Sequence, residues 1–266
     1  MLAAERQNVI RTMLLENKEV SVADLSKYFN VSFETIRRDL KVLENDGFAE
    51  KTYGGAVLRQ RVRNTADFKT LENIMISTKE RLASIAKRFI VSDDCIYIDF
   101  STTCLNIARI LGDVPLNVVS NSLEVLSTLS EKPMISVFSS AGFWDEKNRA
   151  FMGRGALNSL SQFHFDKAFI SCRAISMEHG ISDKTEQEAD IRQMAIECSN
   201  EVYLVADHTK FDKTAFVRTA GFDKITALIT DTPLNDGWKS FLAERSIHYY
   251  DFSTDFTESS DDEGEE

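Results

Sequence analysis

The chain has 266 residues, of which 43% are hydrophobic, and a formal net charge of −11 at pH 7. This size predicts two ordinary domains, and its short apolar runs exclude a membrane-spanning helix or a secretory signal, so we expect a cytoplasmic protein without a membrane partner. The cysteines are scattered and lack partners at metal-binding spacing, so we expect reduced thiols in place of a zinc site or a disulfide framework: Cys95, Cys104, Cys172 and Cys198.

Three helices are predicted near the N-terminus. Residues 3–16 carry apolar side chains at helical spacing. Ser21 begins a capping-box pattern that opens a short helix to Phe29, and Ser32 can cap a further helix through Asp46. Two of these helices flank a short turn, which is the arrangement of a helix-turn-helix unit.

A β-hairpin is predicted directly after the helices. Residues 48–53 and 56–58 flank Gly54 and Gly55, a pair typical of hairpin turns. This hairpin would be the wing of an α+β winged helix-turn-helix domain over residues 1–58.

Beyond a polar and basic stretch, short apolar strands alternate with helices, which predicts an α/β domain with a mostly parallel sheet. We expect a linker over 59–74, a ligand-binding and oligomerisation domain over 75–252, and a disordered acidic tail over 253–266. The expected strands are 95–98, 116–119, 135–138, 168–170, 202–206 and 227–229. The expected helices are 78–90, 103–111, 123–129 and 186–199.

The third predicted helix has the two faces that a DNA-recognition helix needs. Ile36 and Leu40 can anchor it, while Thr35, Arg37 and Arg38 can reach base edges and phosphates in the major groove. The alternative is an ordinary solvated helix on which the arginines pair with neighbouring acidic residues. The expected DNA-contacting residues are Ser21, Ser32, Phe33, Glu34, Thr35, Arg37, Arg38, Lys41, Lys51 and Tyr53.

The distribution of charge agrees with DNA binding by this small domain alone. Residues 1–63 contain 11 Lys and Arg against 9 Asp and Glu, although the whole chain is strongly acidic. Because contact with DNA phosphates needs basic side chains, only the N-terminal segment can face a duplex.

This segment resembles the DeoR family of bacterial transcription regulators. The resemblance rests on Val20-Ser21-Val22, the run from Val31 to Leu40, and Gly54-Gly55-Ala56, and it continues more loosely to about Asp231. It implies a sequence-specific regulator, most simply a repressor of a carbohydrate uptake or catabolism operon. The expected partners are an operator in double-stranded DNA and a second copy of the chain in a dimer or higher homo-oligomer.

Polar clusters follow several of the predicted strands, where parallel sheets usually bind ligands. Ser101, Thr102 and Thr103 place hydroxyl and N–H groups at a helix N-terminus and could hold a phosphate, although such residues also simply cap helices. Similar clusters, and the match to the DeoR family, give a set of expected effector-binding residues: Lys79, Asp99, Ser101, Thr102, Thr103, Asn121, Ser122, Gly142, Arg173, Glu188, Asp207 and Lys210.

The DeoR effector domain is similar in fold to ribose-5-phosphate isomerase and glucosamine-6-phosphate deaminase. The resemblance therefore implies that the effector is a sugar phosphate or a related small anionic metabolite. This chain departs from the family where Ser171, Cys172 and Arg173 follow a strand that the family commonly ends with Gly-Ala. Our hypothesis is that Arg173, with Ser171 and His179, contacts an additional acidic group of the effector. A salt bridge from Arg173 to Glu178 or Glu186 is the alternative.

Two other functions remain open. The first is a sugar-phosphate isomerase-like enzyme with an appended DNA-binding domain, in which Asp99, Asp207 and Lys210 supply acid, base and electrophile. The second is an architectural protein whose larger domain serves only oligomerisation. We favour the regulator, for which we expect no catalytic residues, no metal and no cofactor. Effector binding would rearrange the larger domain, and the connector over 59–71 would pass the change to the DNA-binding domain.

Overall fold

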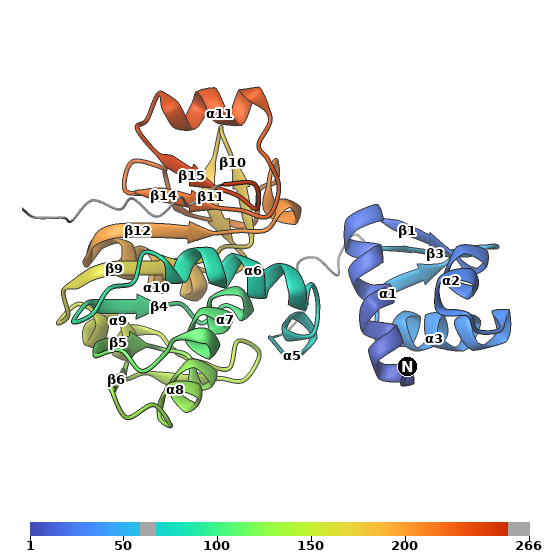
Figure 1. Cartoon of the computed structure of the whole chain (residues 1–266), viewed down its shortest axis with the longest axis horizontal. Helices are drawn as coiled ribbons and strands as arrows, with labels where there is room; N and C mark the ends of the chain where they lie inside the picture. The colour runs from blue at the N-terminus through green and yellow to red at the C-terminus, as the bar shows by residue number, and fades with distance from the viewer. Residues whose placement is uncertain (59–67, 255–266) are drawn as a thin grey trace, which may run out of the picture.

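A computed structural model describes residues 1–58 and 68–254 of the chain. The N-terminal residues 1–58 form a small domain, hereafter the head, at one end of the molecule, and the rest forms a larger C-terminal domain (Figure 1). The head contains α1 (Ala3–Asn17), α2 (Val22–Phe29) and α3 (Phe33–Asn45). The connector over 59–67 and the tail from residue 255 lie outside the described residues, and so do the predictions made for them.

Local hydrogen bonds explain where the two short helices of the head begin and end. The Ser21 hydroxyl accepts the Asp24 N–H at 3.0 Å, and the Ser32 hydroxyl accepts the Thr35 N–H at 3.2 Å. Between the helices, Asn30 has a left-handed backbone with φ of 52°, a conformation that Asn tolerates better than most residues. The predicted caps and turn are therefore confirmed.

The wing differs in two respects from the predicted hairpin. Strands β1 (Glu19–Ser21), β2 (Ala49–Lys51) and β3 (Gly55–Leu58) form an antiparallel sheet in the order β1-β3-β2, and β1 was not predicted. Gly55 lies in β3 and not in the turn. A Cβ on Gly55 would lie 1.9 Å from the Val20 carbonyl oxygen, so glycine is required there by the close approach of β1.

A small core and one buried ion pair hold the head together. The Arg6 Nε lies 2.6 Å from the Asp39 carboxylate, which also accepts a hydrogen bond from Gln7 at 2.9 Å. Arg6 and Asp39 are both buried, so the pair fixes α1 against α3. The apolar side chains of the core include Ile10, Leu14, Leu25, Ile36, Leu40, Leu43 and Phe48.

The C-terminal domain is built on a seven-stranded sheet whose pairings are all parallel. The strand order is β15-β14-β12-β9-β4-β5-β6. The bounds are β4 (Cys95–Ile98), β5 (Leu116–Ser120), β6 (Ile135–Ser139), β9 (Phe165–Ile170), β12 (Ser199–Val205), β14 (Ala227–Ile229) and β15 (His248–Tyr250). This confirms the predicted fold class, including the position of every strand that was expected.

Helices cover both faces of this sheet. The side chains of Ile96 and Ile98 pack on one face and that of Tyr97 on the other, as alternation along a strand requires. One face is covered by α6 (Ile76–Lys87), α7 (Thr102–Ile110) and α8 (Leu123–Leu129). The other is covered by α9 (Arg154–Leu160), α10 (Glu186–Glu197) and α11 (Asp236–Ala243).

Several short elements were not predicted. They are α5 (Phe68–Glu72), the hairpin of β7 (Phe143–Asp145) and β8 (Ala150–Met152), the antiparallel sheet of β10 (Ala174–Ser176), β11 (Gly180–Asp183) and β13 (Val217–Ala220), and the 3₁₀ helix η1 (His208–Lys210). Helices α9 and α11 and the edge strand β15 were not predicted either. Helix α5 falls in the range expected to be a linker. The four cysteines are free thiols, and Cys104 and Cys172 are buried.

Within the two described ranges, the structure has no helix long and apolar enough to cross a membrane.

Candidate functional site

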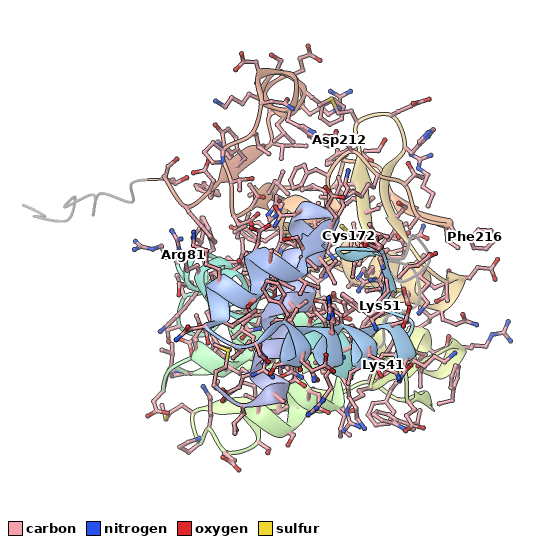
Figure 2. All side chains as sticks on the ribbon, turned by 90° about the vertical axis from the view of Figure 1, so that its right-hand side faces the viewer. Lys41, Lys51, Arg81, Cys172, Asp212 and Phe216 are labelled. Carbon is pink, nitrogen blue, oxygen red and sulfur yellow. The ribbon has the colours of Figure 1, made fainter. Side chains whose placement is uncertain are left out.

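Helix α3 presents a charged outer face to solvent and an apolar face to the core. Arg37, Arg38 and Lys41 are exposed, whereas Ile36 and Leu40 are buried. Figure 2 looks onto the head and labels Lys41 on α3 and Lys51 on the wing. The exposed residues expected to contact DNA also include Ser32, Phe33, Glu34 and Tyr53, while Ser21 and Thr35 are half-buried.

The ion pairs of the head leave the two adjacent arginines of α3 available. Asp39 directly follows Arg38 in the sequence, and its carboxylate already forms an ion pair with Arg6. Neither Arg37 nor Arg38 forms an ion pair with any residue in the described ranges. The ordinary solvated helix with internally paired arginines is therefore not what the structure shows.

A cavity of about 230 Å³ lies between the head and the C-terminal domain. The C-terminal domain contributes polar side chains from α6, α7 and the loop after β12, and the head contributes Leu15 and Phe48. The charged and hydroxyl side chains in its wall are Lys79, Thr102, Thr103, Arg173, Asp207, Thr209, Lys210, Lys213 and Thr214.

A smaller cavity of about 70 Å³ adjoins it. The two cavities share Thr102, Thr103, Arg173 and Lys210 as common wall. The smaller one is lined in addition by groups that can exchange hydrogen bonds with hydroxyls: Ser101, Asn148, Ser171, Asp183 and Glu188. Together the cavities offer a cationic compartment beside a polar one whose wall contains both acidic and basic side chains.

Burial has a strong effect on the Lys79 amine in the larger cavity. It lowers the pKa of Lys79 from 10.5 to about 7, and the nearby Asp207 carboxylate offsets only part of this. The Lys79 Nζ donates a hydrogen bond to the Leu71 carbonyl oxygen. An anion that enters the cavity would favour the charged ammonium.

Asp207 stays ionised in the same cavity. Burial alone would raise its pKa, but the Lys210 charge, the hydrogen bonds from Thr209 and the Lys79 charge together lower it. The Thr209 N–H donates to the Asp207 carboxylate at 2.9 Å, and the Lys210 Nζ lies 3.9 Å from it. This carboxylate can accept hydrogen bonds from ligand hydroxyls.

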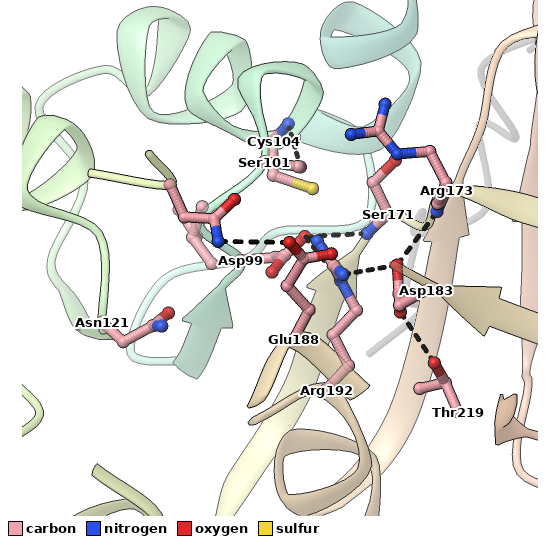
Figure 3. Close-up of polar contacts among 12 residues, drawn as sticks. Asp99, Ser101, Cys104, Asn121, Ser171, Arg173, Asp183, Glu188, Arg192 and Thr219 are labelled. Atoms are coloured by element: carbon pink, nitrogen blue, oxygen red, sulfur yellow. Dashed lines mark hydrogen bonds and ion pairs between the residues drawn. The ribbon is translucent and has the colours of Figure 1, made fainter. Parts of the chain in front are cut away.

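In the wall of the smaller cavity, a buried arginine ties three elements together (Figure 3). The Arg192 guanidinium on α10 lies 3.1 Å from the Asp99 carboxylate and 2.7 Å from that of Asp183. Asp99 also accepts the Ser171 N–H at 3.1 Å, and Asp183 accepts the Thr219 hydroxyl at 2.7 Å. Although burial opposes it, the two carboxylates raise the pKa of Arg192 well above its ordinary value. The network therefore links α10, β11 and the segment after β4 through one buried guanidinium.

Two family models match the chain. The DeoR-like helix-turn-helix domain matches residues 6–62, and the DeoR C terminal sensor domain matches residues 74–232. The chain belongs to the DeoR family. It is a DNA-binding transcriptional regulator with a sensor domain, as the resemblance found in the sequence implied.

Named relatives match almost the whole of this DeoR-family chain. The uncharacterized HTH-type transcriptional regulator YulB of Bacillus subtilis is 35% identical over 93% of this chain and 96% of its own. The HTH-type transcriptional regulator IolR of the same organism is 32% identical over 88% of this chain and 93% of its own. A ribose 5-phosphate isomerase from Methanocaldococcus jannaschii aligns with a TM-score of 0.37 and 13% identity, over 50% of this chain and 53% of that one.

The sensor domain of this DeoR-family protein brings eight of the twelve expected effector residues to the cavities: Lys79, Ser101, Thr102, Thr103, Arg173, Glu188, Asp207 and Lys210. Asp99 lies below them, bound to Arg192. The linings do not include Asn121, Ser122 or Gly142. The Asn121 side chain instead bonds the Tyr97 hydroxyl at 2.8 Å, and Ser122 caps α8.

The contacts of Arg173, Ser171 and His179 bear on the hypothesis that these residues act together. His179 is exposed and its ring lies 3.6 Å from Glu178, so His179 does not accompany Arg173. In the described ranges Arg173 pairs with neither Glu178 nor Glu186. The Ser171 backbone N–H donates a hydrogen bond to the Asp99 carboxylate.

Several lining residues were not anticipated from the sequence. Arg192 is a charged residue directly after Ile191 on a mostly buried helix face, and that pattern could have marked it as a buried ion-pair partner. Lys213 lies three residues beyond the expected Lys210 and gave no separate signal. Leu15 and Phe48 belong to the head, and nothing in the sequence indicates that they meet the sensor domain.

Across the described residues, no cluster of three or more metal-binding side chains is present.

Proposed function

We propose that this protein is a cytoplasmic homo-oligomeric repressor of a carbohydrate uptake or catabolism operon, controlled by a phosphorylated sugar or a related anionic metabolite. The observation that carries the proposal is the cationic cavity whose wall includes both the sensor domain and the head. Repression and a carbohydrate operon are what the likeness to the DeoR family implies.

On the DNA side, the proposal rests on the outer face of α3. Arg37 and Arg38 can form paired hydrogen bonds with guanine or contact phosphates, and Thr35 can reach a neighbouring base edge. Lys51 and Tyr53 on the wing would contact the backbone or the minor groove. Repeated operator half-sites would then be read by the heads of one oligomer.

On the effector side, the phosphate would bind at the first turn of α7. The N–H groups of Thr102 and Thr103 belong to that turn, and unpaired N–H groups at a helix N-terminus favour anions. Lys79 and Lys210 line the same cavity and would add charge-assisted hydrogen bonds. The sugar hydroxyls would then reach the smaller cavity, where Glu188 accepts hydrogen bonds.

The segment between α5 and α6 connects the two domains mechanically. Ile74 and Met75 pack into the core of the head, and the Met75 N–H donates to the Thr12 hydroxyl at 3.3 Å. Met75 also precedes α6, the helix that carries Lys79. A ligand that moves Lys79 would therefore act on the head through the three residues between Met75 and Lys79, and directly through Leu15 and Phe48.

The isomerase-like alternative has less support in this geometry. Asp99, its proposed acid or base, is bound by Arg192 and the Ser171 N–H and is not part of either cavity wall. Incubating the protein with ribose 5-phosphate, fructose 6-phosphate and glucosamine 6-phosphate would reveal turnover if this alternative were correct.

The experiment that tests the proposed function uses purified full-length protein and random genomic fragments. Fragments retained with and without a panel of sugar phosphates are sequenced. We expect a recurring inverted or direct repeat whose recovery changes with at least one sugar phosphate. Retention of fragments without any common sequence would contradict the proposal.

A further inference from the structure

Arg173 follows β9 at the common wall of the two cavities. Its backbone N–H donates hydrogen bonds to the Asp183 carboxylate at 3.0 Å and to the Ser182 carbonyl oxygen at 3.2 Å, so its main chain is fixed. Its side chain is half-buried, and Figure 3 shows the guanidinium directed away from Asp183. Among the residues that the structure describes, this guanidinium has no hydrogen-bond or ion-pair partner.

The acidic neighbours of Arg173 are already occupied. Asp183 is bound by Arg192 and the Thr219 hydroxyl. Glu188 accepts hydrogen bonds from Asn148 at 3.2 Å and from the Lys184 N–H at 3.3 Å. Burial lowers the pKa of Arg173, and these carboxylates offset that only in part. A half-buried guanidinium in this position lacks the anion that its fork of donors would bind.

The larger cavity also has more positive groups than one phosphate needs. Lys79, Arg173, Lys210 and Lys213 line it, and Asp207 is the acidic residue in its wall. One phosphate at the α7 N-terminus would engage Lys79 and Lys210. Arg173 borders both cavities. An anion bound by Arg173 would therefore lie between the larger cavity, where the phosphate would bind, and the smaller cavity, where the sugar hydroxyls would bind.

We propose that Arg173 binds a second anionic group of the effector, so that the preferred class is a phosphorylated sugar acid or a sugar bisphosphate rather than the monophosphate of a neutral sugar. The proposal rests on the proposed function, because it assumes that the cavity is the effector site. It adds the charge pattern of the effector and the residue that reads it. Carboxylate and phosphate share the geometry that a guanidinium binds through two parallel N–H groups.

The test compares two matched pairs of ligands by isothermal titration of the full-length protein. Glucose 6-phosphate is compared with 6-phosphogluconate, and fructose 6-phosphate with fructose 1,6-bisphosphate. We expect at least one diacid to bind the wild type about tenfold tighter than its partner, the value of one charge-assisted hydrogen-bonded contact. In Arg173→Gln the ratio should fall to about one, because glutamine lacks the charge and the fork of donors. Arg245→Gln, at an exposed position just after the end of α11, is the matched control and should keep the wild-type ratio.

The outcomes separate this inference from the proposed function. Equal affinity within both pairs for the wild type, or an unchanged ratio in Arg173→Gln, would overturn the inference. Binding of the monophosphates by the wild type would still support the proposed function in that case. Failure of all four ligands to bind the wild type would overturn both. If Arg173→Gln does not fold, Arg173→Lys retains a point charge without the fork, and we expect an intermediate ratio.

Discussion

Lys79 should make anion binding in the larger cavity depend on pH, and the size of the effect follows from the pKa of Lys79. Its pKa is about 7 in the empty cavity because burial disfavours the ammonium. A bound anion stabilises the ammonium, so binding above about pH 7 must be accompanied by proton uptake. Anion affinity should therefore be constant below that pH and fall as the pH rises above it. Replacing Lys79 with arginine, which stays protonated throughout, should remove the dependence.

The size of the effect follows from the fraction of protonated Lys79. With a pKa of about 7, half of the amine is charged at neutral pH and about 1% two pH units higher. Affinity for an anion that needs the ammonium should then fall about 50-fold over those two units, equivalent to about 2.3 kcal/mol.

Inorganic sulfate is the suitable probe, because its own charge does not change over this range. Its affinity is measured by isothermal titration at a series of pH values between about 6 and 9, together with the protons taken up in buffers of different ionisation enthalpy. We expect a falling affinity for the wild type and a flat profile for Lys79→Arg. If Lys79→Arg does not fold, Lys79→Met should bind weakly and without a pH dependence. A flat wild-type profile, or equal slopes in wild type and Lys79→Arg, would refute the role assigned to Lys79.

Four further substitutions test other parts of the structure. Arg37→Ala should lower affinity for the selected operator by about 1–3 kcal/mol and relax one base preference. Lys51→Ala should instead weaken binding to all duplexes alike and reduce the slope of log affinity against log salt concentration by about one. Titrations at several salt concentrations distinguish these results. Arg192→Leu leaves two buried carboxylates uncompensated and should lower the free energy of unfolding by about 3–5 kcal/mol in urea; a loss under about 1 kcal/mol would mean that the network is dispensable. Gly55→Ala forces a Cβ against the Val20 carbonyl and should lower the melting temperature, while an unchanged value would show that β1 moves aside without cost.

Elements with strong local signals were predictable from the sequence. The Ser21 and Ser32 caps act within three residues, and the apolar spacing of α3 is visible in a single helix. The buried parallel strands, such as β4 (Cys95–Ile98), appear as continuous apolar runs. Short strands such as β1 and β10 have three residues each, too few for a periodic pattern, and they exist because distant partners supply their hydrogen bonds.

The cavity could be predicted only in part. Lys79, Thr102 and Lys210 follow from strand ends and from the family resemblance, because parallel strands bring their carboxyl ends to one edge. Asn121 accepts the Tyr97 hydroxyl, and a Cβ on Gly142 would lie 2.6 Å from the Met152 carbonyl oxygen, so both positions serve packing. The sequence could not separate this role from ligand binding, because both roles use the same residue types after a strand. The contribution of the head could not be predicted, because Leu15 and Phe48 are ordinary apolar helix and strand residues in the sequence.

The central claim is that the outer face of α3 reads a duplex under the control of an anion in the cavity. The most direct test is the affinity of the full-length protein for its selected operator, measured by fluorescence anisotropy against random competitor DNA with and without 6-phosphogluconate or fructose 1,6-bisphosphate. We predict sequence-specific binding that is lost in the Arg37→Ala, Arg38→Ala double variant and altered by at least one of these ligands in the wild type. Equal binding of operator and random DNA by the folded wild-type protein would contradict the account.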